Sequence, residues 1–375
     1  MADDNKVTVH LVAGARPNFM KVAPLYHALA NEAWCRPILV NTGQHYDASM
    51  SDAFIRDLAL PSPDHHLGIG GGTHAQQTAR VMIAYETLCL KHPPDWIVVV
   101  GDVDSTLACA LVAAKLRIPL AHLEAGLRSW DRSMPEEINR ILTDQVADLL
   151  WTPSKDADEN LLREGISHDA INCVGNIMID SFELVRDRIM AARMRDKFGL
   201  NATDYGVVTL HRPVNVDATS TLITIIRELA TVSHEMPLVF PVHPRTRERL
   251  LEAGFPEQLE SGHNLTLLEP MGYIEFMSLV CEAKLVITDS GGLQEETTYL
   301  NIPCLTLRES TERPITTTMG TNKLVRVGEI QQAVDQIRTG RWKIGNCPAL
   351  WDGQTASRVV ESLRAQVDRP YLPKG

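Results

Sequence analysis

Three carboxylates in the first half of the sequence stand where acid–base chemistry is possible. Asp102 and Glu124 each follow a short apolar run, and such runs are typical of buried strands in a parallel sheet. If the two runs are neighbouring strands, about 4.8 Å apart, these side chains lie roughly 5–10 Å from each other. Glu136 opens a predicted helix, where an acidic residue can also serve only the helix dipole. Together the three are candidates for proton transfer.

The second half contains a segment suited to binding an anion, Thr288–Glu296, which follows an apolar run and opens a predicted helix. Gly291 and Gly292 let backbone N–H groups approach a phosphate at the helix N-terminus, and Ser290 adds a hydroxyl donor. The closing glutamate can accept hydrogen bonds from sugar hydroxyls. The alternative is a tight turn in which Ser290 or Asp289 caps the helix. The segment has neither a Walker lysine nor a spaced G-x-G-x-x-G, so it is not a P-loop or an NAD fingerprint.

Cationic and imidazole side chains follow other apolar runs. Arg16 lies in a predicted strand-to-helix turn, with Lys21 one helical turn further on, and a guanidinium fixed there can grip a phosphate. The alternative is a solvated surface arginine. His211 and His243 end two neighbouring predicted strands. A single such histidine is more often structural, but two in matching positions favour a function.

Elements of two kinds must position these residues. Short apolar runs alternate with stretches of helical length, which predicts βαβ units. The runs form two series of similar size, so we expect two doubly wound α/β domains whose ligands bind beyond the carboxyl ends of the strands. The predicted strands are Val7–Ala13, Pro37–Asn41, Trp96–Val100, Pro119–Leu123, Leu149–Thr152 and Ile171–Val174, then Gly206–Leu210, Pro237–Val242, Leu265–Leu268, Leu285–Thr288 and Cys304–Leu307.

Composition narrows the classes of function. The 375 residues are 44% hydrophobic and 22% charged, which is ordinary for a globular protein of about two domains. The net charge of −11 argues against a nucleic-acid partner, and no apolar run reaches the length of a membrane helix. The first residues lack the features of a signal peptide, so we expect a cytoplasmic protein. The seven cysteines show no zinc spacing, and we expect reduced thiols and no metal.

Several strings, in order from the first predicted strand to about Val325, resemble the non-hydrolysing UDP-N-acetylglucosamine 2-epimerases. A set of strings in the right order is far more specific than any one alone. The resembling strings are Gly14–Lys21, Thr42–His45, Gly101–Asp102, His122–Arg128, Met134–Arg140, Leu210–Arg212, Thr288–Glu296 and Thr311–Pro314.

The resemblance implies a GT-B-like arrangement. A Rossmann-like domain spans residues 1–178 and includes a returning C-terminal helix at 357–375, a second one spans 179–356 and binds UDP, and the active site lies between them. It also implies interconversion of UDP-GlcNAc and UDP-ManNAc by a cytoplasmic homodimer that uses no cofactor and no metal. The reaction would eliminate UDP to a 2-acetamidoglucal and add it back.

Residue roles follow from the same resemblance. The catalytic group is implied to be Asp102, Glu124, Glu136 and His211, and which carboxylate removes the proton stays open. The residues implied to bind the substrate are Arg16, Lys21, Gln44, His45, His243, Phe276, Ser290, Gly291, Gly292, Glu296 and Arg313.

The chain departs from the family at two places. Asn18 stands where many members carry Glu, and Gly68–Thr73 replaces an Arg-Gln-containing stretch. In bacterial members activated by their own substrate, that stretch helps to hold a second UDP-sugar. We therefore expect the initial rate to depend hyperbolically on UDP-GlcNAc concentration. A clearly sigmoidal rate curve would contradict this.

Other functions fit parts of the pattern. A C2 epimerase of a related sugar nucleotide, such as a 2,3-diacetamido-uronic acid derivative, would use the same chemistry. A hydrolysing relative would release free ManNAc and UDP. A GT-B glycosyltransferase shares the nucleotide half but leaves Glu124 and Glu136 unexplained. A non-catalytic nucleotide-sugar binder would hold UDP and change no UDP-sugar.

Overall fold

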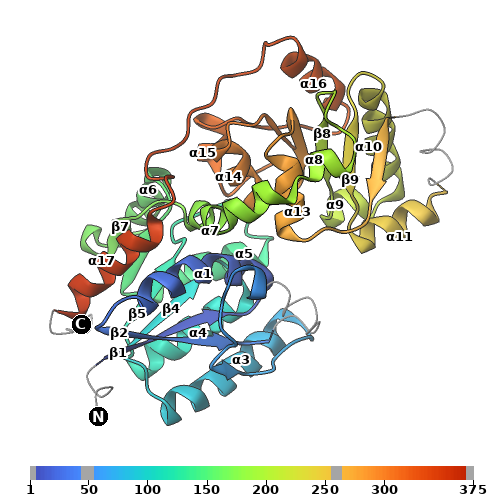
Figure 1. Cartoon of the computed structure of the whole chain (residues 1–375). Coiled ribbons are helices and arrows are strands. Elements are labelled where there is room, and N and C mark those ends of the chain that lie inside the picture. Colours follow the sequence, from blue (N-terminus) through green and yellow to red (C-terminus); the bar gives the residue numbers. More distant parts are fainter. Residues whose placement is uncertain (1–5, 44–54, 255–263, 369–375) are drawn as a thin grey trace. The chain divides into compact units, whose positions relative to one another are not determined.

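The structure is a computed structural model that describes residues 6–43, 55–254 and 264–368 (Figure 1). The chain divides into two compact units, one of Met1–Leu184 with Ala349–Gly375 and the other of Val185–Pro348. Each unit is built around one parallel β-sheet with helices between its strands. The predicted fold class, an α/β protein with two doubly wound sheets, is confirmed.

The first unit contains a seven-stranded sheet in the order β3-β2-β1-β4-β5-β6-β7. Helices α3, α4 and α5 pack against one another in sequence, while α17, from the end of the chain, packs on α1. The strands are β1 (Val7–Ala13), β2 (Cys35–Asn41), β3 (His65–His66), β4 (Trp96–Val100), β5 (Leu120–Leu123), β6 (Leu149–Thr152) and β7 (Ile171–Cys173). The helices are α1 (Arg16–Ala30), α3 (His74–Lys91), α4 (Asp104–Leu116), α5 (Pro135–Val146), α6 (Lys155–Arg163), η1 (His168–Ala170), α17 (Thr355–Val367) and the first part of α7 (Ile177–Ala192), which continues after Leu184 as part of the second unit.

The second unit contains a six-stranded sheet in the order β10-β9-β8-β11-β12-β13. Its strands are β8 (Gly206–Thr209), β9 (Leu238–Pro241), β10 (Leu265–Leu268), β11 (Leu285–Thr288), β12 (Cys304–Thr306) and β13 (Asn322–Leu324). Its helices are α8 (Met194–Lys197), α9 (Pro213–Val216), α10 (Thr219–Ser233), α11 (Pro244–Glu252), α13 (Tyr273–Val280), α14 (Gly291–Tyr299), α15 (Pro314–Thr318) and α16 (Ile330–Arg338).

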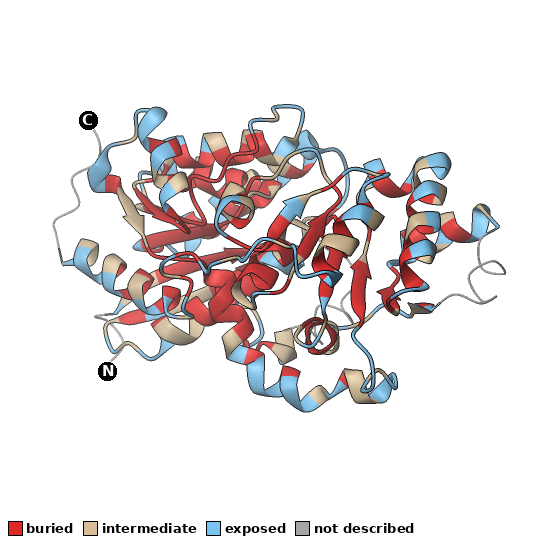
Figure 2. Ribbon diagram, turned by 90° about the horizontal axis from the view of Figure 1, so that it is seen from above, coloured by how far each residue is buried: buried red, intermediate tan, exposed pale blue. Residues whose placement is uncertain are grey.

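The central strands are buried on both faces, which explains their unbroken apolar runs. Every residue of β4 and β11 is buried, and so are the first three residues of β8, which end at Val208. Figure 2 shows the same burial in the interior of both sheets. Parallel sheets require this composition because helices cover both faces. The two strands that sequence reasoning missed, β3 and β13, lie at sheet edges, are two and three residues long, and contain polar residues.

Each sheet reverses its direction of winding at one point. In the first sheet the order runs outward from β1 to β3 and from β4 to β7, so the reversal falls between β1 and β4. In the second it falls between β8 and β11. Open α/β sheets bind ligands at the carboxyl ends of the strands beside this switch point. The turns after these four strands are therefore the places to seek a site in each unit.

Within the part of the chain that the structure describes, no helix is long and apolar enough to cross a lipid bilayer.

Candidate active site

Glu124 and Lys21 form a buried ion pair at the carboxyl edge of the first sheet. Glu124 follows β5 and Lys21 lies in the second turn of α1, and their side chains are only 5% and 8% exposed. Gly101, directly after β4, leaves room for the pair, because a methyl group there would lie 3.1 Å from Lys21 Nζ and 3.3 Å from Glu124 Oε2. A buried titratable group with one specific charge partner is a candidate for chemistry.

The backbone at Glu124 is held in an unfavourable conformation. Its φ of 71° lies in the left-handed region, which costs a residue with a side chain about 1–2 kcal/mol. The backbone N–H groups of Glu124 and Ala125 both donate to the carbonyl oxygen of Trp151 in β6, at 3.0 Å each. Strand β6 thus fixes the turn that carries the Glu124 carboxylate, and strain of this kind gathers at functional sites.

Asn18 joins the two strands at the first switch point. Its Oδ1 accepts from the backbone N–H of Ala15 at 2.9 Å, which caps α1, and its Nδ2 donates to the carbonyl oxygen of Val100 at 2.9 Å. An ionised glutamate at this position would have no N–H with which to make the second bond. The asparagine therefore fixes the start of α1, and with it Lys21, against the end of β4.

Asp102 is paired with a residue that sequence reasoning did not select. Its carboxylate contacts the guanidinium of Arg140 on α5, and the two side chains are 30% and 3% exposed. Arg140 is held in turn by Glu137, whose Oε2 accepts from Arg140 Nε at 3.1 Å and Nη2 at 2.8 Å. Asp102 is thus a partly accessible carboxylate whose charge is balanced by a buried arginine.

A fully buried network supports the turns that carry Asp102 and Glu124. The two ring nitrogens of His122, in β5, lie 2.6 Å from Asp144 Oδ1 and 2.9 Å from the carbonyl oxygen of Gly101. Asp144 Oδ2 accepts from the Gly126 backbone N–H at 3.1 Å and lies 2.7 Å from Arg128 Nη2. Burial alone would raise the pKa of Asp144, but His122 and Arg128 bring it below its ordinary value.

The other predicted residues of the first half are less constrained. Glu136 is half-buried at the second position of α5, and its side chain makes no hydrogen bond or ion pair within the described ranges. Arg16 is exposed at the first position of α1. Gln44 and His45 lie outside the described residues. The structure therefore brings Lys21 and Glu124 into contact, and places Asp102 one residue beyond the glycine beside them.

In the second unit, His211 is anchored at the switch point by Asp289. The Asp289 carboxylate lies 2.9 Å from His211 Nδ1 and accepts from the backbone N–H of Arg212 at 2.9 Å and from Asn215 Nδ2 at 3.0 Å. Asp289 is fully buried, whereas the His211 side chain is 42% exposed. Burial favours a higher pKa for Asp289, but the His211 hydrogen bond and charge lower it. A carboxylate orients one ring nitrogen and leaves the other for a ligand.

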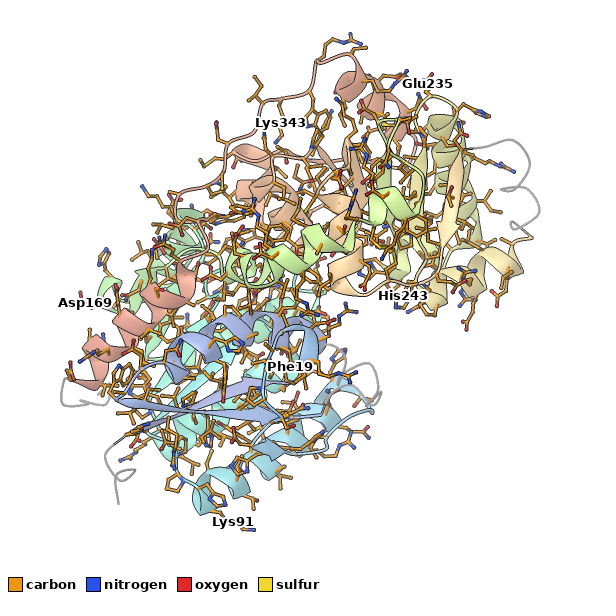
Figure 3. The ribbon with its side chains drawn as sticks, in the orientation of Figure 1. Phe19, Lys91, Asp169, Glu235, His243 and Lys343 are labelled. Carbon is orange, nitrogen blue, oxygen red and sulfur yellow. The ribbon has the colours of Figure 1, made fainter. Side chains whose placement is uncertain are left out.

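His243 lies at the matching position of the neighbouring strand. It follows β9 and begins α11, where its Nδ1 accepts from the Arg245 backbone N–H at 3.3 Å (Figure 3). The centroid of its ring is 6.5 Å from that of His211. Burial, together with the neighbouring His211 and Arg245, lowers the pKa of His243. The predicted pairing of the two histidines at adjacent strand ends is thus present in the structure.

The start of α14 has the geometry of an anion cradle. Ser290 occupies the N-cap position, but its side chain makes no capping hydrogen bond. A methyl group on Gly291 would lie 2.6 Å from Glu312 Oε1 and 3.0 Å from Arg313 Nη1, so only glycine lets the helix begin this close to those side chains. Backbone N–H groups at such a helix start, beside an arginine, suit a phosphate.

Glu296 is buried further along α14 and bonds to a tyrosine on α13. Tyr273 Oη donates to Glu296 Oε1 at 2.6 Å. Burial raises the pKa of Glu296 to about 7, and the charge of Glu295 adds to the rise, whereas the Tyr273 bond lowers it. Phe276, predicted to contact the nucleotide, is half-buried on the same helix as Tyr273. The Glu296 carboxylate therefore carries a proton over part of the neutral range.

This raised pKa predicts a pH dependence of the free energy of unfolding. The unfolded chain ionises Glu296 near pH 4.5 and the folded chain only near pH 7, so the folded state loses stability as pH rises through this window. Glu296→Gln should remove a cost of about 3 kcal/mol at pH 8 and change little at pH 4. Denaturant titrations at both pH values measure this, with the exposed Glu309→Gln as control. An equal effect of Glu296→Gln at the two pH values would contradict it.

Three partners in these sites are not among the residues that the sequence predicts to form them. Arg140, Asp289 and Tyr273 each contact a predicted residue that is distant along the chain, at separations of 38, 78 and 23 residues. For Asp289, after β11, the sequence predicts a possible helix cap. The one usable signal is the place of Arg140 four residues after Glu136, on the same face of α5.

Both units have the doubly wound α/β architecture that is found in many nucleotide-binding proteins, with polar turns at their switch points. The second unit also has an anion cradle at the start of α14. Within the described ranges, no three His, Cys, Asp or Glu side chains are grouped so as to hold a metal ion.

The family model for UDP-N-acetylglucosamine 2-epimerase matches residues 27–364. The chain belongs to the UDP-N-acetylglucosamine 2-epimerase family.

Individual relatives cover nearly the whole chain. It is 42% identical over 369 residues to the UDP-N-acetylglucosamine 2-epimerase of Methanocaldococcus jannaschii, covering 94% of this chain and 98% of that protein. It is 40% identical over 358 residues to the UDP-2,3-diacetamido-2,3-dideoxy-D-glucuronate 2-epimerase of Pseudomonas aeruginosa, with the same coverage. The crystal structure of the M. jannaschii UDP-GlcNAc 2-epimerase in complex with UDP-GlcNAc and UDP has a TM-score of 0.83 at 39% identity, covering 96% of this chain and all of that one.

Proposed function

We propose that this protein interconverts UDP-GlcNAc and UDP-ManNAc without hydrolysis, by eliminating UDP to 2-acetamidoglucal and adding it back. The observation that carries the proposal is the buried Glu124–Lys21 pair beside Gly101, with Asp102 next in the chain. Family membership and the complex of the M. jannaschii relative with UDP-GlcNAc and UDP support it.

The chemistry requires more than one acid–base group. The C2 hydrogen of the sugar has no neighbouring carbonyl to acidify it, so a base alone removes it too slowly. Departure of UDP from C1 gives the ring oxocarbenium character, which a nearby carboxylate stabilises. Return of a proton to the opposite face of C2 then reverses the stereochemistry. Proton-transfer groups are needed on both faces, and Asp102, Glu124 and Glu136 are the candidates.

The geometry gives each carboxylate a different environment. Glu124 is buried against one ammonium, Asp102 is 30% exposed and paired with Arg140, and Glu136 is half-buried without a partner among the described residues. We propose that the Lys21 ammonium balances the charge of the Glu124 carboxylate, which acts as a base or a charge stabiliser.

We propose that the second unit binds UDP. The start of α14, with Ser290, Gly291 and Gly292, would receive the diphosphate together with Arg313, and the buried Glu296 would accept from the ribose hydroxyls. His211, oriented by Asp289, would stabilise the leaving diphosphate. Hydrogen bonds from charged donors to phosphate oxygens are about twice as strong as neutral ones, which favours UDP as a leaving group.

The product assay separates the epimerase from the hydrolysing alternative. The purified protein is incubated with UDP-GlcNAc, and the mixture is resolved by anion-exchange chromatography. We expect UDP-ManNAc to accumulate to a constant ratio with UDP-GlcNAc, with free sugar and UDP only in trace amounts. Stoichiometric free ManNAc and UDP would contradict the non-hydrolysing assignment, and an unchanged mixture would contradict the enzyme.

A second candidate function is C2 epimerisation of a UDP-sugar that carries other substituents at C3 and C6. The P. aeruginosa relative, named for a 2,3-diacetamido-glucuronate substrate, is 40% identical to this chain, against 42% for the M. jannaschii relative. The C2 chemistry would be the same in both. Comparing kcat/KM for the two UDP-sugars decides between them, and we expect the higher value for UDP-GlcNAc.

A further inference from the structure

Arg308 lies beside the start of α14 and belongs to none of the groups assigned so far. It follows β12 after Leu307, and its side chain is only 5% exposed. Its Nη2 donates to Glu312 Oε2 at 2.9 Å. A long cationic side chain this far from water must be held by partners, because an unpaired buried charge is very costly.

Glu312 links Arg308 to Arg313. Its other oxygen, Oε1, accepts from Arg313 Nη1 at 2.5 Å, and Arg313 Nε lies 2.9 Å from Glu295 Oε1. Burial would raise the pKa of Glu312, but the charges of Arg313 and Arg308 hold it well below its ordinary value. Two cations and two anions thus balance, and the single Glu312 carboxylate sets the positions of both guanidinium groups.

Arg308 has one donor group without a partner in the part of the chain that the structure describes. Arg308 Nη1 is buried and makes no hydrogen bond to any described residue. It lies 3.7 Å from the point that a methyl group on Gly291 would occupy, at the first residue of α14. A buried N–H group without an acceptor costs about 1–3 kcal/mol, so it calls for a role in the protein's function.

We propose that Arg308 is a binding residue for the diphosphate, and that its Nη1 donates to a phosphate oxygen seated at the N-terminus of α14. This rests on the proposed binding of UDP by the second unit. Two independent features point to the same ligand: the helix start, whose backbone N–H groups favour an anion, and the unpartnered guanidinium donor beside it. Glu312 holds Arg308 in place with its other nitrogen, so Nη1 stays available.

The test compares UDP with uridine, which lacks the diphosphate. Isothermal titration calorimetry measures both dissociation constants for the wild type, Arg308→Gln, Arg308→Lys and the control Arg326→Gln, an exposed arginine of the same unit. We expect Arg308→Gln to weaken UDP binding about 10–100-fold and leave uridine binding within about twofold. Arg308→Lys keeps the positive charge but loses the planar guanidinium with its several N–H donors. Its UDP affinity should fall between those of the wild type and Arg308→Gln. Arg326→Gln should match the wild type.

A Glu312→Gln background separates direct contact from an indirect effect through Glu312. If Arg308 touches the diphosphate, Arg308→Gln still weakens UDP binding in Glu312→Gln protein. Loss of the effect in that background would mean that Arg308 acts only by holding Glu312, and would overturn the proposal. An equal loss of uridine affinity would overturn it as well. A wild-type protein that binds neither ligand would instead reject the proposed function, on which the inference rests.

Discussion

Glu124→Gln should lower kcat for UDP-GlcNAc epimerisation by about 10²–10⁴-fold while changing KM little. The substitution keeps the size and one hydrogen-bond acceptor of the side chain, so Lys21 retains a partner, but it removes the charge and the ability to take a proton. General acid–base groups contribute this much to rate. Because Glu124 is buried and its turn is fixed by Trp151, the glutamine side chain should occupy the same place as the carboxylate. Turnover is followed by NMR of the two UDP-sugars.

The control is Glu159→Gln, which changes an exposed glutamate on α6 paired with Arg163. It should keep wild-type kcat, because exposed pairs contribute at most about 1 kcal/mol to stability and this one lies away from the switch point. Both variants are first shown to melt at the wild-type temperature. Near wild-type turnover of folded Glu124→Gln would remove Glu124 from the catalytic group.

Asp144→Ala should destabilise the protein by about 3–5 kcal/mol, the range found when one partner of a buried ion pair is removed. The alanine leaves a ring N–H of His122 and the Gly126 backbone N–H without this acceptor, while Arg128 Nη2 keeps only Glu164 Oε2, at 2.6 Å. Since His122 also bonds the carbonyl oxygen of Gly101, the turn that carries Asp102 should loosen, and kcat of the remaining folded protein should fall. Denaturant unfolding at pH 7 measures the change in stability.

Asp169→Ala is the matched control, since Asp169 is an exposed aspartate in the same unit (Figure 3). Its effect should stay within about 0.5 kcal/mol, as for most surface substitutions. If Asp144→Ala unfolds at the same denaturant concentration as Asp169→Ala, the buried network does not stabilise the turns that carry Asp102 and Glu124.

The fold could be predicted from the sequence because the central strands of both sheets are buried on both faces. Runs such as Trp96–Val100 and Leu285–Thr288 lack polar alternation, and their structured bounds agree with the predicted ones. The pattern fails where burial ends. His65–His66 and Asn322–Leu324 are edge strands with polar side chains, and their pairing depends on neighbours that no local pattern reveals.

The site could be predicted only in part, because strand ends are local features and partners are not. The positions of Asp102, Glu124 and His211 follow from the strands that precede them. That Lys21 reaches Glu124 depends on the packing of α1 beside β4 and on the absence of a side chain at Gly101. The pairing of Glu296 with Tyr273 likewise depends on how α13 lies against α14. Tertiary packing sets such contacts, and sequence spacing does not encode them.

The most direct measurement follows the C2 hydrogen during turnover. The purified protein is incubated with UDP-GlcNAc in heavy water, and proton NMR monitors the C2 positions of both UDP-sugars as they equilibrate. If a carboxylate removes this proton while UDP leaves, and a solvent-derived proton returns to the other face, deuterium appears at C2 of the product. A UDP-ManNAc product that keeps its original C2 hydrogen would contradict the account.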